Sequence, residues 1–307
     1  MKINKYSHTI FLAIAISAIA ASTGYAGDSK LRIVENPENH SLIVYREGES
    51  KPVLTQNARP DFRPYLHPLQ SPDGKSVMTE FSPGHHKHQT GIYWGITDLN
   101  GRDFFHHPGG DYWKRVMIKP VVPHGTEVSW FTLYHMLGAD GHPIMLEKQH
   151  WSMRENGGRF VLSLEWTAEA VTDLTIGQRP YGGLFTRMPW RDGMDGRIVN
   201  STGQKGVAAD GQRANWIDIG LKLDGRDDEA HISILDHPRN DGHPLHWRID
   251  NQFGAGPSRA ISGSWTIPNG QSVTFRHQLI VYVGAFDAVQ SDDFWKAYAE
   301  AKFLNER

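Results

Sequence analysis

The sequence contains no cysteine. This excludes disulfide bridges, thiolate nucleophiles, iron–sulfur clusters, thiolate zinc sites and a lipid anchor on an N-terminal cysteine. A domain of this composition must depend on the size of its core for stability, and a chain of this length can bury a large core.

Long hydrophobic runs are also scarce, and the one present lies at the N-terminus. Ile10–Ala21 is apolar apart from one serine and follows two positive charges, Lys2 and Lys5. It is shorter than the roughly 20 residues that cross a bilayer, so a cleaved signal peptide is favoured over a membrane anchor. We therefore predict a signal peptide over residues 1–26 and a periplasmic or secreted single domain over residues 27–307, with no later membrane span.

The chain lacks a strongly basic segment and the common enzyme motifs. Lys and Arg number 32 against 34 Asp and Glu, and no stretch concentrates positive charge as a nucleic-acid partner requires. No G-x-S-x-G elbow, P-loop, dinucleotide-binding glycine motif or H-E-x-x-H pair occurs. The sequence therefore argues against nucleic-acid binding and against several hydrolase and nucleotide-binding classes.

Helix signals are rare, whereas short apolar segments separated by turns are frequent. Asn269-Gly270 between Gly263–Ile267 and Val273–Val283 predicts a hairpin, and Arg179–Gln212 reads as long loops. The best helix signal is Ser291–Lys302, with Ser291 as N-cap. One helix after many strands predicts an all-β sandwich or barrel.

One predicted strand shows how its two faces differ. In Phe160–Trp166, the apolar Phe160, Leu162, Leu164 and Trp166 share one face, and Ser163 and Glu165 share the other. We expect the first face in the core and the second toward a cleft.

Histidine is the outstanding feature of the composition. Ten of the 17 histidines lie between His67 and His150, and the densest segment contains His86 and His88. If this segment runs extended into the following strand, both imidazoles point to one face. Such a pair could bind a divalent metal ion, or serve as sugar-binding and acid–base groups, or form a structural cluster. A cupin is disfavoured because the glutamate that follows its histidine pair is missing.

Other histidines lie in separate loop-like contexts, among them His67, His106 and His237. Each alone could be structural, but functional residues favour loops on a rigid scaffold. We expect at least three of these five histidines to line one cleft.

Tryptophan and arginine accompany these histidines. Trp216 is one of ten tryptophans, and Arg187 lies next to Met188-Pro189-Trp190. Indole faces stack on sugar rings, and guanidinium groups bind carboxylates or hydroxyls. Core packing and a buried Arg–Asp pair are the structural alternatives.

A series of motifs resembles the PmoA-like domain family of bacterial proteins over nearly the whole mature chain. In chain order, the motifs are Arg63–Pro68, His86–Gly91, Asn100–Phe104, Gly182–Met188, Asn200–Gly203, Arg213–Trp216 and Asp236–Asn240. Many relatives carry a third histidine and an arginine where this chain has Gln89 and Thr90. The resemblance implies a large antiparallel β-sandwich, a supersandwich similar to galactose mutarotase, with a sugar-related function. The family is often labelled a methane oxygenase.

The main hypothesis is an exported carbohydrate-active enzyme, a hydrolase, lyase or isomerase, that uses a histidine-rich cleft on a carbohydrate or other small molecule. A non-catalytic sugar-binding protein is the alternative, and an oxygenase is the third. A divalent metal ion is the only cofactor suggested, with His86 and His88 as its ligands. Catalytic roles are assigned to His86, His88 and His67, and substrate-binding roles to Arg63, Tyr65, His106, Arg187, Trp216, His237 and Asn240.

Overall fold

The structure is a computed structural model that describes residues 29–301 and 303. The predicted signal peptide, residues 1–26, lies outside the described residues.

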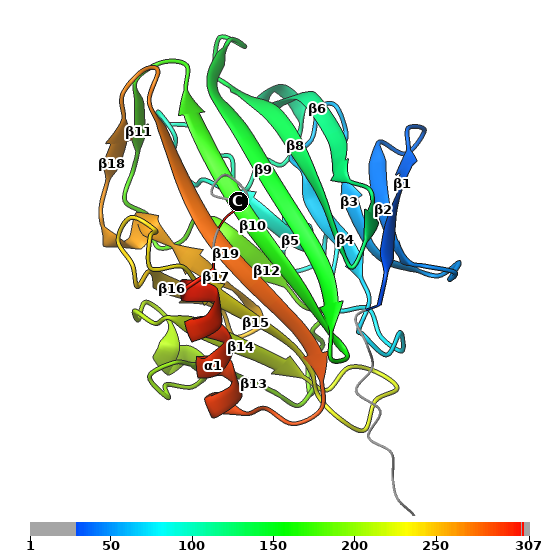
Figure 1. The fold of residues 1–307 in the computed structure, drawn as a ribbon. Coiled ribbons are helices and arrows are strands. Elements are labelled where there is room, and N and C mark those ends of the chain that lie inside the picture. The colour runs from blue at the N-terminus through cyan, green and yellow to red at the C-terminus, as the bar shows by residue number, and fades with distance from the viewer. Residues whose placement is uncertain (1–28, 302, 304–307) are drawn as a thin grey trace, which may run out of the picture.

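Two large sheets face each other across the core (Figure 1). In spatial order, the first sheet contains β16 (His246–Ile249), β17 (Gly254–Ser258), β12 (Gly183–Arg187), β5 (Ile92–Gly95), β4 (Tyr65–Leu69), β3 (Pro52–Asn57), β2 (Ser41–Arg46), β1 (Leu31–Asn36) and β7 (His124–Gly125). The second contains β13 (Gly196–Asn200), β14 (Trp216–Leu221), β15 (Ala230–Asp236), β19 (Ser272–Val283), β10 (Arg159–Ala170), β9 (Pro143–Asn156), β8 (Glu127–Leu137) and β6 (Trp113–Val122). We refer to them as the nine-stranded and the eight-stranded sheet.

The smaller elements are a two-stranded sheet, three 3-10 helices and one α-helix. They are β11 (Leu174–Ile176) with β18 (Trp265–Ile267), η1 (Gly110–Tyr112), η2 (Gly206–Ala209), η3 (Arg259–Ser262) and α1 (Ala288–Ala299). The strand pairs of all three sheets are antiparallel. The predicted antiparallel sandwich with a short C-terminal helix is confirmed.

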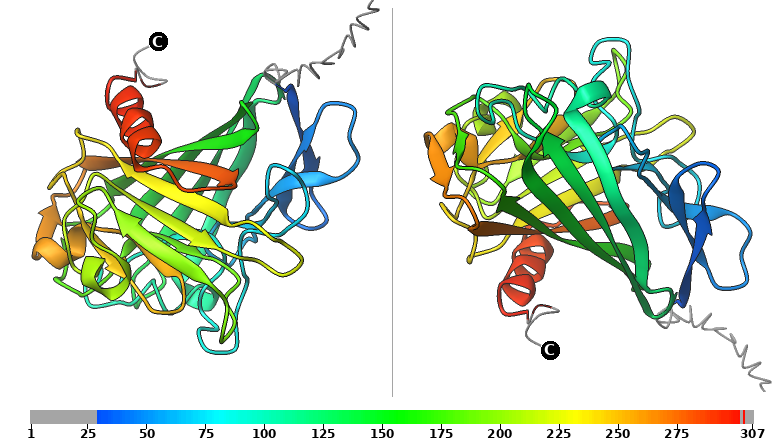
Figure 2. Two further views of the ribbon diagram at one scale, coloured as in Figure 1. Left: turned by 90° about the horizontal axis from the view of Figure 1, so that it is seen from below. Right: turned by 90° about the horizontal axis from the view of Figure 1, so that it is seen from above.

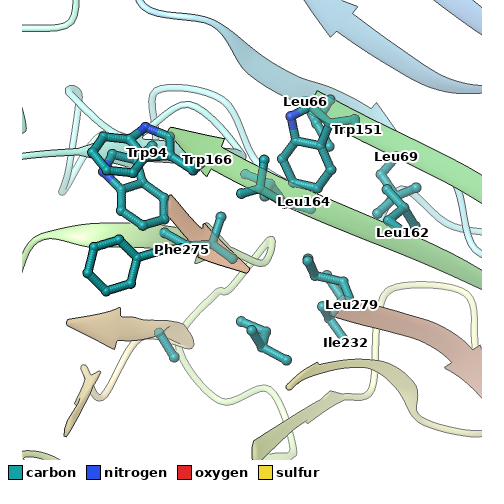
Figure 3. Close-up of a cluster of buried hydrophobic side chains, with 14 of the residues drawn as sticks. Leu66, Leu69, Trp94, Trp151, Leu162, Leu164, Trp166, Ile232, Phe275 and Leu279 are labelled. Carbon is teal, nitrogen blue, oxygen red and sulfur yellow. The ribbon is translucent and has the colours of Figure 1, made fainter. Parts of the chain in front are cut away.

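The core lies between the inner faces of the two large sheets, as the close-up in Figure 3 shows for part of it. Phe160, Leu162, Leu164 and Trp166 of β10 are all buried there, as their alternation predicts. Trp166 stacks on Trp94 of the opposite sheet with ring centroids 4.1 Å apart, which ties the layers together at one end. The polar face of β10 places Ser163 and Glu165 at a pocket outside the eight-stranded sheet, as expected.

Two predictions about the strands are wrong. β18 pairs with β11, so the turn at Asn269-Gly270 does not join a hairpin. Arg179–Gln212, predicted as loops, contains two strands, β12 and β13. The five residues of β12 are all buried, and because a strand covered on both faces shows no alternation, its pattern was missed.

Helix α1 begins earlier than predicted. Its N-cap is Asp287, whose carboxylate accepts hydrogen bonds from the backbone N–H groups of Val289 and Gln290 at 2.9 and 3.2 Å. Ser291 lies inside the helix, where its hydroxyl donates to the Asp287 carbonyl oxygen. The helix lies outside the eight-stranded sheet, as the two views in Figure 2 show.

Candidate functional site

The candidate site lies on the outer face of the nine-stranded sheet, over β5 and β12. Trp94 and Leu184 point into the core, so their neighbours Tyr93 and Phe185 point outward. Phe105 packs on both, with centroids 5.4 Å from Tyr93 and 5.5 Å from Phe185. This aromatic layer gives the polar groups above it a rigid floor.

A pocket of about 110 Å³ opens above this floor. Its lining consists of His86, His88, Gln89, Phe105, His106, Tyr181, Phe185, Arg248 and Asp250. The structure therefore brings three of the five singled-out histidines, His86, His88 and His106, to one pocket. They come from the segment before β5 and the segment after it.

Asp103, His106 and Tyr181 form a hydrogen-bonded chain at the pocket. His106 Nδ1 lies 2.7 Å from Asp103 Oδ2, and His106 Nε2 lies 3.3 Å from the Tyr181 hydroxyl. Burial raises the pKa of Asp103, but hydrogen bonds from His106 and the backbone N–H of Phe105 outweigh it and the pKa is lowered. The carboxylate therefore stays ionised and orients the imidazole.

His88 is a neutral imidazole at the pocket. Burial lowers its pKa to about 3, with further lowering from His106, Arg63 and His86. Its ring lies 4.5 Å from that of His106, centroid to centroid. A neutral ring can both donate and accept a hydrogen bond, which suits a ligand hydroxyl.

His86 also favours the neutral form, because burial and then Arg187 lower its pKa. The segment around it does not run extended, the condition under which both imidazoles would share a strand face. Backbone hydrogen bonds from His86 to the Pro83 carbonyl and from Gln89 to the His86 carbonyl close two turns. His86 Nδ1 lies 2.7 Å from His85 Nδ1, so one of these two nitrogens donates to the other. Within residues 29–301 and 303, no group of three or more His, Asp or Glu side chains is placed to hold a metal ion.

Arg187 is fully buried behind the pocket and forms an ion pair with Asp250. This is the buried Arg–Asp pair that the sequence offered as the alternative to ligand binding. Arg187 Nη2 lies 2.5 Å from Asp250 Oδ2, and the guanidinium also donates to the Gln89 side chain and the Gln252 carbonyl. A side chain at Gly254 would collide with this pair, since its Cβ would lie 2.4 Å from Arg187 Nη2. The guanidinium thus fixes Gln89 and Asp250 and does not itself line the pocket.

Arg63 is fully buried as well. It donates to the carbonyl oxygens of His88 and, at 2.7 Å, of Phe105, and its guanidinium lies 3.6 Å from the centroid of the Tyr93 ring. Burial lowers its pKa to about 10. It does not line the pocket but ties together the two segments that carry His88 and His106.

His67 and Tyr65, from β4, lie beside the pocket and do not line it. Both rings pack on Phe81, and His67 Nδ1 lies 3.0 Å from the Thr79 hydroxyl. Burial lowers the pKa of His67. The sequence assigned a catalytic role to His67, but its side chain does not line the pocket.

Three further predicted site residues lie elsewhere, in contacts that hold the C-terminal part of the fold. The His237 ring packs on Tyr298 and Phe303, and the Asn240 amide donates to Asp236 and to the Arg276 carbonyl, both at 2.7 Å. The Trp216 indole donates to Asp292 of α1 at 2.8 Å. The Asp236–Asn240 segment therefore connects structural elements, a role that polar composition alone could not distinguish from binding.

Several pocket residues were missed. Arg248 and Asp250 stand in segments with no local motif, and Tyr181 directly precedes the Gly182–Met188 motif without being singled out. Only the fold brings these three residues to the histidines. Asp103 could have been found, because an aspartate three residues before a histidine, with a turn between them, can hold its ring.

The fold and site together define an antiparallel β-sandwich with a histidine pocket on one outer face. Residues 38–296 match the protein family described as "Family of unknown function (DUF6807)", and the chain belongs to this family. The resemblance to the PmoA-like domain family is thereby corrected, and the oxygenase reading that depended on it is withdrawn. No curated protein matches the chain.

Two solved structures illustrate the fold likeness. Galactose 1-epimerase from Lactobacillus acidophilus NCFM is similar with a TM-score of 0.39 and 9% identity, over 84% of this chain and 99% of that one. The GH36 α-galactosidase AgaB from Geobacillus stearothermophilus gives a TM-score of 0.38 and 11% identity, over 82% of this chain and 41% of that one. The chain thus matches less than half the length of the galactosidase.

In the described part of the chain, no helix has the length and hydropathy needed to span a bilayer.

Proposed function

We propose that the protein is an exported enzyme that carries out acid–base chemistry on a small carbohydrate in the histidine pocket. The observation that carries the proposal is the Asp103–His106–Tyr181 chain, with distances of 2.7 and 3.3 Å, at the wall of an open pocket. An imidazole oriented by a carboxylate through Nδ1 presents Nε2 for proton transfer, and Asp103 stabilises the imidazolium that results.

The lining of the pocket supports a sugar as the ligand. His88, His86 and Gln89 offer neutral donors and acceptors for hydroxyl groups, and Phe105 and Phe185 offer apolar ring surface. A sugar has both a hydroxylated edge and an apolar face, so it fits a pocket with this division of surfaces. The pocket is also small, which suits a single sugar unit better than a long chain segment.

The roles of the residues follow from their positions. His106 Nε2 takes or returns the substrate proton, and the Tyr181 hydroxyl, in contact with it, is the second proton-transfer group. His88 and His86 bind hydroxyls, and Arg63 holds the segments of His88 and His106 together through hydrogen bonds to their backbone carbonyl oxygens. The catalytic role thus moves to His106 from His86, His88 and His67, the three residues that carried it in the sequence analysis.

A screen of mono- and oligosaccharides and keto-sugars, with products detected by mass spectrometry and with and without chelator, tests the proposal. On any substrate found, His106→Ala lowers turnover by about 10²-fold or more, the scale of losing an acid–base group. His142→Ala, in an exposed hairpin loop, is the matched control and keeps full turnover. Sugar binding in the pocket without turnover would identify a binding protein, and full activity of His106→Ala would reject the assignment.

Export is part of the proposal and depends on the N-terminal segment with its apolar run. N-terminal sequencing of protein from the native host is expected to begin within a few residues of Gly27. A sequence beginning at Met1 would contradict export with cleavage.

A further inference from the structure

The pocket is poor in free carboxyl groups. Among its described lining residues, the only carboxylate is Asp250. Asp250 Oδ1 accepts hydrogen bonds from the backbone N–H groups of Gln252 and Gly254, both at 2.9 Å, and Oδ2 is paired with Arg187. The neighbouring Asp103 is likewise occupied as an acceptor by His106 and two backbone N–H groups.

This inventory argues against glycoside hydrolysis by two carboxyl groups. That mechanism needs one carboxylic acid to protonate the leaving oxygen and a second carboxylate, roughly 5–9.5 Å away, to act as nucleophile or base. Asp250 and Asp103 are both held as hydrogen-bond acceptors, so neither is placed to donate a proton. The proton-transfer groups that face the pocket are instead the His106 imidazole and the Tyr181 phenol.

One guanidinium group remains available to a ligand. Arg187 and Arg63 are fully buried, and their guanidinium N–H groups donate hydrogen bonds to protein acceptors. Arg248, from β16, lines the pocket with its side chain 32% exposed. Among the described residues, its guanidinium forms one side-chain hydrogen bond, an ion pair from Nη1 to Asp210 at 2.9 Å, so Nε and Nη2 are left for a ligand. It lies 5.7 Å from the Tyr181 ring centroid, which places it on the side of the pocket where the His106–Tyr181 pair stands.

A base, a phenol and an adjacent guanidinium are the groups needed to remove a proton from the carbon next to a carboxylate. The base accepts the proton, and the cation stabilises the negative charge that then develops on the carboxylate oxygens. Guanidinium groups match carboxylates well because they offer two parallel N–H donors.

We infer that the pocket takes a sugar acid, that Arg248 binds its carboxylate, and that the reaction begins by proton abstraction from the adjacent carbon. This rests on the proposed function. In the step, the C–H bond breaks, the proton moves to His106 Nε2, and the electron pair spreads into the carboxylate that faces Arg248. In one outcome, a proton returns to the carbon. In the other, the C–O bond at the next carbon breaks, a C=C bond forms, and the leaving oxygen takes the proton of the Tyr181 hydroxyl, which the proton on His106 Nε2 replaces. Neither outcome needs an oxidant or water.

The test uses matched sugar pairs that differ at C6, methyl glycosiduronates and the corresponding neutral methyl glycosides of the galacto, gluco and manno series. For at least one pair, the acid binds wild-type protein about tenfold or more tightly than its neutral partner, as measured by calorimetry. Arg248→Gln reduces the affinity for the acid to that for the neutral sugar. Arg59→Gln, an exposed arginine with its guanidinium 3.7 Å from Asp61, keeps the preference.

Proton abstraction is measured separately, by incubating the protein with the sugar acids in D₂O. Wild-type protein introduces deuterium at C5 of the bound acid, or produces the unsaturated acid, and His106→Ala slows this by about 10²-fold. Equal binding of acids and neutral sugars would overturn the inference and leave the proposed function standing. So would tight binding of an acid without any change at C5. Failure of every sugar to bind would overturn both.

Discussion

Two Asp–His pairs of this protein have the same hydrogen bond and different surroundings. His106 Nδ1 lies 2.7 Å from Asp103, with both side chains 35% exposed, and His231 Nδ1 lies 2.8 Å from Asp218, with both fully buried. In the second pair, His231 Nε2 meets the Gly284 carbonyl at 3.0 Å, and Asp218 also accepts from Ser233 and Tyr282. An Asp–His pair is therefore a candidate for catalysis only where the imidazole lines a pocket that a ligand can enter, as His106 does.

The same substitution at both aspartates separates the two roles, and the larger effect is expected at the buried pair. Asp218→Asn removes the negative charge that faces His231, Ser233 and Tyr282 inside the protein. Breaking a buried pair in this way lowers the free energy of unfolding by about 3–5 kcal/mol. Urea denaturation measures the loss, and a change below about 1 kcal/mol would show that the pair is not structural.

Asp103→Asn is expected to act mainly on turnover. The partly exposed pair contributes little to stability, whereas an imidazole without its carboxylate is poorly oriented and its protonated form is less stable. We expect a fall in kcat of about 10²-fold with KM nearly unchanged and a melting temperature close to that of the wild type. A variant with full kcat would remove the distinction between the two pairs.

A buried histidine outside both pairs is expected to make stability depend on pH. His277 is fully buried beside Asp236, Leu235 and His243, and burial lowers its pKa from 6.5 to about 4. The unfolded chain therefore binds a proton between these values that the folded chain does not, so stability falls as pH falls from about 6.5 to 4. His277→Gln should reduce the slope of unfolding free energy against pH by up to one proton, measured by urea denaturation at several pH values. The pKa values of other histidines, among them His88 and His237, are also lowered, so an unchanged slope in His277→Gln would show that His277 is not the group responsible.

The smallest effect is expected at His67, next to the pocket. His67→Ala removes a ring that packs on Phe81 and meets the Thr79 hydroxyl, and it leaves the pocket lining intact. Turnover should fall by less than about tenfold, below the scale of an acid–base group. A loss as large as that of His106→Ala would restore the catalytic role first assigned to His67.

The sequence predicted well what depends on local pattern. Alternation in β10 identified its core face, and the turn residues Asn269-Gly270 marked the start of β19. It failed at β12, where burial on both faces removes alternation, and at β18, whose partner lies far away in the chain. Local pattern carries no information about which distant segment will pair.

The site was predicted in part for the same reason. The density of histidine pointed to His86 and His88, and His106 was named as a binding residue. Arg187 and His237 have the same polar character in the sequence, yet the fold buries Arg187 behind the pocket and uses His237 to pack the C-terminal segment. Whether a polar side chain binds a ligand or the protein itself depends on which acceptors surround it, and tertiary structure determines that.

Arg63 has a consequence for how this pocket can change. Its guanidinium holds the segments of His88 and His106 through main-chain carbonyl oxygens, at His88 and Phe105. Because every amino acid supplies the same carbonyl, the side chains of both segments can be exchanged while the tether remains. The pocket can therefore be adapted to new ligands, by natural variation or by design, through its loop side chains, as long as the arginine beneath them is retained.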